Sequence, residues 1–291
     1  MMVINDLKDQ MPLREISRIS GISLSGYYYK PVKRHIQRLD PSIKERIKDI
    51  ASERPTYGYR RVWAILRNQG TRVNQKTVRK VLKDSNLNLP ASKHRGRTKS
   101  RNLFRPQGPD QLWETNITYI PTESGMTYLM CIKDTFTKEW QGYHYSRSCM
   151  AGDAIRSVEN AILMAFNGLV PKGLVLRTDN GPQYISNEFR NAMKLLGIKL
   201  EYIQKHTPED NGDIESFHNS IKTDYIWPNE FRDFHDASIG IEKAFTDYNE
   251  CRPHSSIDYL PPREFRRKFL NDKSFREIFE KKEAEVTLDE N

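Results

Sequence analysis

Hydrophobic residues recur at helical spacing through the first ninety positions of the chain. The first apolar stripe consists of Leu13, Ile16 and Ile19. Gly21 follows this stripe at a point where a turn requires a positive φ. Three further stretches carry an apolar residue every three or four positions, at 42–53, 56–70 and 73–87. The pattern predicts a helix-turn-helix over residues 1–40 and a second helical domain over residues 41–90.

A different pattern begins after residue 107. Three segments have the alternating or continuous apolar character of strands, at 111–121, 127–134 and 139–146. Helical and strand patterns then alternate, with helices expected at 151–166, 187–196 and 211–225 and short strands at 173–179 and 198–203. This order predicts an α/β ribonuclease H-like core over residues 108–270, with three antiparallel strands, two further strands and helices on both faces. A charged C-terminal tail is expected over residues 271–291.

Charge is distributed unevenly along the chain. The formal net charge of +9 is the sum of +17 over residues 1–105 and −8 over residues 106–291. Such asymmetry predicts a nucleic-acid-binding N-terminal part, although a solvated basic surface would have the same composition. The three cysteines have no CxxC spacing, which argues against a disulfide framework and a structural zinc site. The sequence shows no signal peptide and no membrane-spanning apolar run, so we expect a cytoplasmic, nucleoid-associated protein without a membrane partner.

Candidate DNA contacts follow from the polar faces of the predicted helices. The outward face of the 73–87 helix carries Gln75, Lys76, Arg79, Lys80 and Lys83. The start of the preceding helix adds Arg60 and Arg61. Glutamine can read adenine and arginine can read guanine in the major groove, but a plain solvated helix face remains the alternative. A basic linker over residues 91–107 adds phosphate contacts from Arg95, Arg97, Lys99 and Arg101.

Two carboxylates are placed so that they could meet at one edge of the predicted sheet. Asp179 ends a buried strand, and Glu215 lies on a later helix with 35 residues between them. Convergent carboxylates suit divalent cations, and two such ions support phosphoryl transfer. Asn211, Asn219 and Lys222 share the helix face of Glu215 and are expected to hold DNA there. The alternative for Asp179 is a turn residue in the segment Asp-Asn-Gly.

Several segments together resemble a known family. These segments are QLWETNITYI, LRTDNGPQYIS, EDNGDIESFHNSIKTDYIW and YNECRPHSSIDYLPPREF, preceded by YGYRRVWAILRNQG and VNQKTVRKVLKDSNL. They resemble the DDE transposases encoded by the second reading frame of IS-three-family insertion sequences, which are similar to retroviral integrases. The resemblance implies a metal-dependent transposase that uses Mg²⁺ or Mn²⁺, two ions in all, and acts in DNA transposition, recombination and integration. It also implies cleavage and strand transfer at terminal inverted repeats, contact with target DNA, and a homo-oligomer (dimer or tetramer) on DNA.

The resemblance also assigns the acids of the catalytic triad. Asp179 matches the second acid and Glu215 the third, with the family's interval between them. Asn116 occupies the position of the first acid, and its neutral amide is a weaker metal ligand than a carboxylate. We therefore expect the chain to be inactive or nearly so. An exchange that traps a DNA complex and the decay of one element copy would both produce Asn116, and the intact remainder of the motifs favours the exchange.

Other interpretations remain open at this point. Asp134 could replace the missing ligand, although a turn-initiating role before Thr-Phe-Thr is the favoured interpretation. His218, Arg252 and His254 are further candidates for contact with DNA. The alternatives to a transposase are a catalytically dead, repurposed DNA-binding protein and a ribonuclease H-like nuclease.

Overall fold

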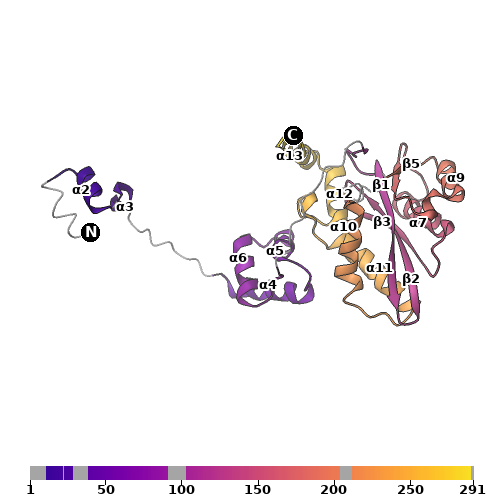
Figure 1. Ribbon diagram of the computed structural model, residues 1–291, viewed down its shortest axis with the longest axis horizontal. Coiled ribbons are helices and arrows are strands. Elements are labelled where there is room, and N and C mark those ends of the chain that lie inside the picture. The colour runs from indigo at the N-terminus through magenta and orange to yellow at the C-terminus, as the bar shows by residue number, and fades with distance from the viewer. Residues whose placement is uncertain (1–10, 22, 29–38, 91–102, 204–211, 290–291) are drawn as a thin grey trace. The chain divides into compact units, whose positions relative to one another are not determined.

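The computed structural model describes residues 11–21, 23–28, 39–90, 103–203 and 212–289, which form two compact units divided after residue 43 (Figure 1). In the first unit, α2 (Leu13–Ser20) and α3 (Leu24–Tyr28) flank Gly21. Gly21 has a φ of +70°, as the sequence predicts, and Ile16 is the buried residue of α2. The expected pair of short helices is therefore present in this unit.

A three-helix segment follows, made of α4 (Pro41–Glu53), which spans the division, α5 (Tyr59–Asn68) and α6 (Gln75–Asp84). The apolar stripes of the sequence meet in its interior, where Ile47, Val62, Leu66, Val78 and Leu82 are buried. The side chain of Asn74 caps α6 by accepting a hydrogen bond from the backbone N–H of Lys76 at 2.8 Å. Trp63 Nε1 donates to the carbonyl oxygen of Val73 at 2.9 Å, which fixes the connection between α5 and α6.

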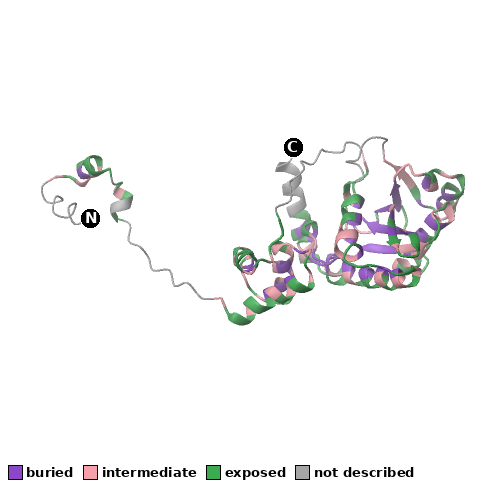
Figure 2. Cartoon of the chain, turned by 60° about the horizontal axis from the view of Figure 1, so that its bottom comes forward, coloured by how far each residue is buried: buried purple, intermediate pink, exposed green. Residues whose placement is uncertain are grey.

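A five-stranded mixed sheet follows in the order β3-β2-β1-β4-β5. Its strands are β1 (Leu112–Thr122), β2 (Gly125–Asp134), β3 (Trp140–Ser146), β4 (Val175–Thr178) and β5 (Lys199–Tyr202). The first three strands pair antiparallel, and β4 joins β1 and β5 in parallel. Buried strands lie between helices whose outer surfaces are exposed (Figure 2). This topology confirms the predicted ribonuclease H-like core.

Two hydrophobic clusters bury the two faces of the sheet. One face is covered by α7 (Ala151–Phe166), α8 (Pro182–Ile185) and α9 (Asn187–Leu195), and the other by α10 (Gly212–Ile221) and α11 (Phe234–Glu250). At Gly142 the backbone of β3 lies so close to α7 that a Cβ atom would stand 2.6 Å from the Cα atom of Ala161. Only glycine fits at this point, and its absent side chain lets the helix approach the sheet.

The helix that carries Glu215 changes its form near its end. The sequence predicts one helix from 211 to 225, whereas α10 ends at Ile221 and continues as a π-helical segment (Lys222–Ile226). The wider turn brings Asp224 to the guanidinium of Arg252, and it brings the Tyr225 hydroxyl to Asp247. The two polar contacts account for a deviation that periodicity alone does not reveal.

The C-terminal part consists of a short 3₁₀ helix (Ser255–Ile257), α12 (Pro262–Asn271) and α13 (Lys273–Asp289). A cluster of phenylalanines joins these elements to the core: Phe136, Phe265, Phe269, Phe275 and Phe279. Phe279 is only 8% exposed, so the segment expected as a charged tail also contributes apolar packing. Among the described helices, none has the length and apolar composition needed to cross a membrane.

Candidate active site

Asn116 lies on β1, and Asp179 directly follows the neighbouring strand β4. The parallel register pairs Glu114 of β1 with Arg177 of β4, and each candidate residue lies two positions further along its own segment. Neighbouring strands are separated by about 4.8 Å, so this register brings the two side chains into one region. Asp179 Oδ1 accepts a hydrogen bond from the backbone N–H of Gly181 at 2.8 Å. Asn116 Oδ1 accepts one from the N–H of Ile117 at 2.7 Å.

Glu215 lies on a helix that covers the same face of the sheet. Alternation along β1 puts Asn116 on the face of Ile120, which packs with Ile214 and Phe217 of α10. Glu215 follows Ile214 in the first turn of α10 and is exposed. The element geometry therefore puts the helix of Glu215 on the sheet face that carries Asn116.

A buried tyrosine joins the segment after Asp179 to β1 on the opposite face of the sheet. Tyr184 of α8 shares a hydrogen bond with Thr115 Oγ1, at 3.2 Å between the oxygens. Burial raises the pKa of the Tyr184 hydroxyl well above its usual range, with a smaller contribution from the nearby Asp179. Tyr184 is thus neutral and ties the turn after Asp179 to the strand that carries Asn116.

Asp134 is fully occupied by a turn. Its Oδ1 accepts hydrogen bonds from the Thr137 N–H at 2.6 Å and from Thr137 Oγ1 at 2.7 Å. Its Oδ2 accepts from the N–H of Asp110 at 2.8 Å. These contacts support the turn interpretation over the role of a substitute metal ligand.

Two lysines hold the start of α10. Asp213 Oδ2 lies 2.8 Å from Lys133 Nζ and 3.0 Å from Lys138 Nζ. Burial opposes ionisation of Asp213, but the two ammonium groups hold its pKa well below the usual range. Lys133 is itself buried, and this burial lowers its pKa. The ion pairs fix the helix two residues before Glu215. Sequence reasoning missed them, although a lysine within the apolar run TYLMCIKD was a usable signal.

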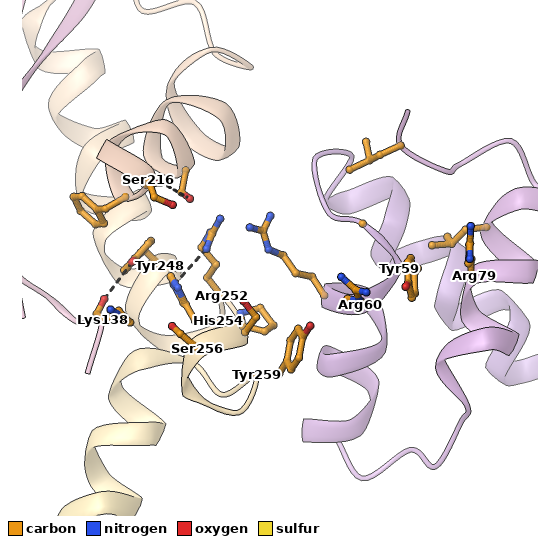
Figure 3. A pocket seen from close by; sticks show the side chains of 18 of the residues that line it. Tyr59, Arg60, Arg79, Lys138, Ser216, Tyr248, Arg252, His254, Ser256 and Tyr259 are labelled. Atoms are coloured by element: carbon orange, nitrogen blue, oxygen red, sulfur yellow. Dashed lines mark hydrogen bonds between the residues drawn. The ribbon is translucent and has the colours of Figure 1, made fainter. Parts of the chain in front are cut away.

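The predicted DNA contacts of the three-helix segment fall on two surfaces. Arg60, Arg61, Arg79 and Lys83 line a cleft of about 930 Å³ between this segment and the core, which we call the interdomain cleft (Figure 3). Its core wall is formed by α10, the end of α11 and residues 252–259. Gln75, Lys76 and Lys80 are not part of its lining. The predicted face of α6 is therefore divided between the cleft and the remaining surface.

The other predicted contacts are placed as follows. Asn219 is exposed and lines a smaller pocket of about 370 Å³ together with Glu215 and Arg61. Lys222 is half-buried and begins the π-helical segment. Arg95, Arg97, Lys99, Arg101 and Asn211 lie outside the residues that the structure describes.

The three further candidates for DNA contact are largely internal. His218 is 6% exposed, and neither ring nitrogen has a hydrogen-bond partner among the described residues. Burial, followed by the charges of Lys222 and Lys133, lowers the pKa of His218 to about 3. The expectation that His218 contacts DNA is wrong, because its side chain is covered. Arg252 is paired with Asp224 at 2.8 Å, and its Nη1 lies 3.3 Å from His254 Nε2.

Direct contacts join the three-helix segment to the core. Arg54 forms a bidentate pair with Asp247 of α11. Asn68 donates to the carbonyl oxygen of Tyr259 at 3.0 Å, and the Tyr259 ring packs edge-on against Trp63 at 5.8 Å. Arg67 donates to the carbonyl oxygen of Asp258. These contacts hold the walls of the interdomain cleft.

The three candidate residues are of the types that bind a hard cation, with one negative charge fewer than three acids would provide. Asp179 and Glu215 offer carboxylate oxygens and Asn116 offers an amide oxygen, and Mg²⁺ and Mn²⁺ prefer oxygen ligands. Within the described part of the chain, no group of three or more His, Cys, Asp or Glu side chains could hold a metal.

Comparisons with known proteins identify the family to which the domains belong. Two integrase core domain models match residues 106–208 and 196–262, and an HTH-like domain model matches residues 38–95. The transposase for insertion sequence element IS904 of Lactococcus lactis is 30% identical over 81% of this chain and 97% of its own length. The putative transposase InsK for IS150 of Escherichia coli is 28% identical over 91% of this chain and 97% of its own length.

A solved structure is also similar. The catalytic core domain of the HTLV-2 integrase in complex with magnesium is 20% identical, with a TM-score of 0.43, over 56% of this chain and 99% of that chain. The matching domain models and the 30% identity to a transposase along most of both chains establish the relationship. The chain belongs to the IS-three-type DDE transposases.

Proposed function

We propose that this chain binds the terminal inverted repeats of an insertion sequence and belongs to a machinery that cleaves and joins DNA with divalent metal ions. One observation carries the proposal: Asn116 and Asp179 each lie two positions beyond the paired residues Glu114 and Arg177, and the helix with Glu215 covers the sheet face of Asn116. Asp179 and Glu215 are the proposed metal ligands, and Asn116 takes the place of the first acid.

The reaction would be an in-line attack on a phosphodiester bond, first by water and then by the freed 3′-hydroxyl. When bound, two Mg²⁺ or Mn²⁺ ions would supply charge stabilisation at the phosphodiester oxygens. The residues of the chain position the proposed metal ligands. The Gly181 N–H orients Asp179, and the Lys133 and Lys138 pairs with Asp213 fix the helix start beside Glu215. Asn219 lies on the exposed surface near Glu215, where a phosphate of the substrate could bind.

Asn116 makes the chain a binder of DNA ends with little or no catalysis. An amide contributes no negative charge, so the ions are held more weakly than by three carboxylates. The test compares the chain with the Asn116→Asp variant on DNA that carries the element's ends. Nicking and joining with Mg²⁺ are expected only for the variant. If the variant with cognate ends and Mn²⁺ breaks no strand, the catalytic proposal fails.

A second candidate function is a DNA-binding protein without catalysis, and Asn116 is the observation that favours it. Such a protein would occupy the element's ends in the same way and would remain inactive after Asn116→Asp. Strand transfer by the unmodified chain would eliminate this candidate.

The partners follow from the same proposal. The DNA partners are the terminal inverted repeats and the target duplex, and acting on two ends requires at least two copies of the chain. We therefore propose a dimer or tetramer assembled on DNA, acting at the nucleoid in the cytoplasm. Analytical ultracentrifugation with and without end DNA would measure the number of copies.

A further inference from the structure

The interdomain cleft contains more positive charge than its acids balance. Its lining includes Arg60, Arg61, Arg79 and Lys83 from the helical wall and Lys133, Lys138 and Arg252 from the core wall. Asp213 is the acid among the lining residues, and its carboxylate is already bound by Lys133 and Lys138. The cleft therefore attracts an anion.

The four cations of the helical wall make no ion pair with any described residue. Three of them are held by aromatic rings instead. The guanidinium groups of Arg60 and Arg79 lie 5.5 and 5.7 Å from the centre of the Tyr59 ring, and Tyr59 and both arginines are labelled in Figure 3. Arg61 lies 5.2 Å from the ring of Tyr57. Stacking orders these side chains while their N–H groups stay available to a ligand.

The core wall presents a buried donor without a partner. Arg252 is 2% exposed, and its Nε and Nη1 are bound to Asp224 and His254. Its Nη2 is buried and has no hydrogen-bond partner in the described structure. Leaving a buried charged donor unpaired costs free energy, and an acceptor oxygen in the cleft would remove this cost. Burial, and then the charge of Arg252, lowers the pKa of Arg61.

The cleft is continuous with the pocket that contains Glu215. Arg61, Ser216, Ser220 and Arg252 line both hollows. A polyanion bound beside Glu215 could thus extend along α10 into the cleft without leaving the protein surface. A volume of about 930 Å³ has room for more than a single phosphate ion.

We propose that the interdomain cleft binds backbone phosphates of the DNA whose cleaved bond lies at Glu215, through Arg61, Arg79, Lys83 and Nη2 of Arg252. The inference rests on the proposed function and adds a second contact surface to it. The cleft side of α6 then contacts backbone phosphates. The side with Gln75, Lys76 and Lys80 stays available to a groove of the duplex. A sugar–phosphate backbone fits this site because the charged lining acts on phosphates and not on base edges.

The test places a negative charge in the core wall, away from α5 and α6. Ser256 is exposed and lines the cleft, and Ser124 is an exposed serine of the β1–β2 turn in the same core. Binding of labelled end DNA by Ser256→Glu and by the control Ser124→Glu is measured by fluorescence anisotropy between 50 and about 300 mM salt, where phosphate contacts set the slope. We expect Ser256→Glu to bind at least about tenfold more weakly, with a salt dependence reduced by roughly one contact, and Ser124→Glu to match the unmodified chain.

A second variant guards against a folding defect. Arg79→Gln combined with Lys83→Gln removes charge from the helical wall, and its slope of log affinity against log salt is expected to fall by about two. Unchanged affinity and slope in both variants, with intact thermal unfolding, would overturn the cleft proposal and leave the proposed function standing. An unmodified chain that binds no end DNA would overturn the proposed function together with the inference.

The same variants separate DNA from a free phosphate compound. Inorganic phosphate and a deoxynucleoside triphosphate are each added at millimolar concentration, and the midpoint of thermal unfolding is recorded. Stabilisation of the unmodified chain that Ser256→Glu abolishes, with DNA affinity unchanged in that variant, would assign the cleft to a small phosphate ligand. That result would contradict binding of the DNA backbone.

Discussion

Arg54 donates from both Nη atoms to the two carboxylate oxygens of Asp247, at 2.6 and 2.5 Å, across 193 positions of the chain. Tyr225 donates its hydroxyl to the same carboxylate at 2.8 Å. Burial opposes the charge on Asp247, but the Arg54 and Tyr225 hydrogen bonds lower its pKa. The carboxylate therefore joins the three-helix segment, the π-helical segment and α11 at one point.

This contact predicts a measurable coupling energy. Arg54→Gln is expected to lower the free energy of unfolding by about 1–2 kcal/mol, because a half-exposed pair is weaker than a buried one. Chemical denaturation of Arg54→Gln, Asp247→Asn and the double variant gives the coupling directly. Lys48→Gln, which removes an exposed pair with Glu45, is the control and should change stability by less than about 0.5 kcal/mol. Additive effects of Arg54→Gln and Asp247→Asn would contradict the contact.

The start of α10 predicts an asymmetry between two substitutions. Asp213→Asn leaves two ammonium groups without their counterion, and we expect a loss of about 2–3 kcal/mol in unfolding free energy. Lys133→Met replaces a buried charge with an apolar side chain of similar length and leaves Lys138 paired, so a change within about 1 kcal/mol is expected. Urea denaturation of both variants checks the order. Equal losses would show that Lys133 is needed for more than charge balance.

His218 predicts a pH dependence of stability. Its pKa is about 3 in the fold against the ordinary value of 6.5, so the unfolded chain takes up the proton first as the pH falls. The contribution to stability is complete above pH 6.5 and is lost between pH 6.5 and 3. The expected slope is at most about 1.4 kcal/mol per pH unit. His218→Gln should flatten the pH profile of the unfolding midpoint, while His235→Gln, at an exposed histidine of α11, should not. Parallel profiles for all three proteins would refute the assignment.

Metal affinity gives a prediction that does not depend on catalysis. Asn116→Asp adds a carboxylate beside Asp179, and we expect Mn²⁺ to bind about tenfold more tightly or better, since even outer-shell partners change metal affinity by roughly 10–100-fold. Calorimetric titration of the full chain with Mn²⁺ measures this change. Asp179→Asn in the Asn116→Asp background should cancel the gain, and an unaffected affinity in that double variant would remove Asp179 from the ligand set.

The phenylalanine cluster predicts that α13 supports the core. Phe279 is 8% exposed, and Phe279→Ala is expected to cost about 3 kcal/mol of unfolding free energy. The neighbouring Ile278 is 56% exposed, so Ile278→Ala should change stability by no more than about 0.5 kcal/mol. Thermal unfolding compares the two. Equal effects would mean that the helix is not packed on α12.

Local patterns were sufficient for most elements of the fold. The helix predicted at 151–166 corresponds to α7 (Ala151–Phe166), because its apolar positions repeat strongly and asparagine ends it in the left-handed region. The turn between β1 and β2 is also local, because only Glu123 and Ser124 separate the paired residues Thr122 and Gly125. Such elements are determined by residues close together in the chain.

Long-range contacts lay beyond sequence reasoning. Nothing near Arg54 indicates that its partner is Asp247, and the helical pattern of 211–225 does not show where the π-helical turn begins. The candidate triad could be proposed because strand ends and helix starts meet at sheet edges, and it stays a prediction. The division of the α6 face between the cleft and the open surface depends instead on how two folded parts dock. The candidate DNA contact at His218 is wrong, since a single histidine in a helix carries no sign of its burial.

The positions of the docking partners have a consequence for the newborn chain. Arg54, Arg67 and Asn68 are synthesised early, but Asp247, Asp258 and Tyr259 leave the ribosome only after most of the core. Domains fold during synthesis from the N-terminus onward. The three-helix segment is therefore made before the core residues that it contacts, and until then its basic side chains have no opposite cleft wall. A chain truncated before α11 would keep the basic helices α5 and α6 but would lack the C-terminal residues of the opposite wall of the interdomain cleft. The complete protein and its truncated forms would then contact DNA through different sets of residues.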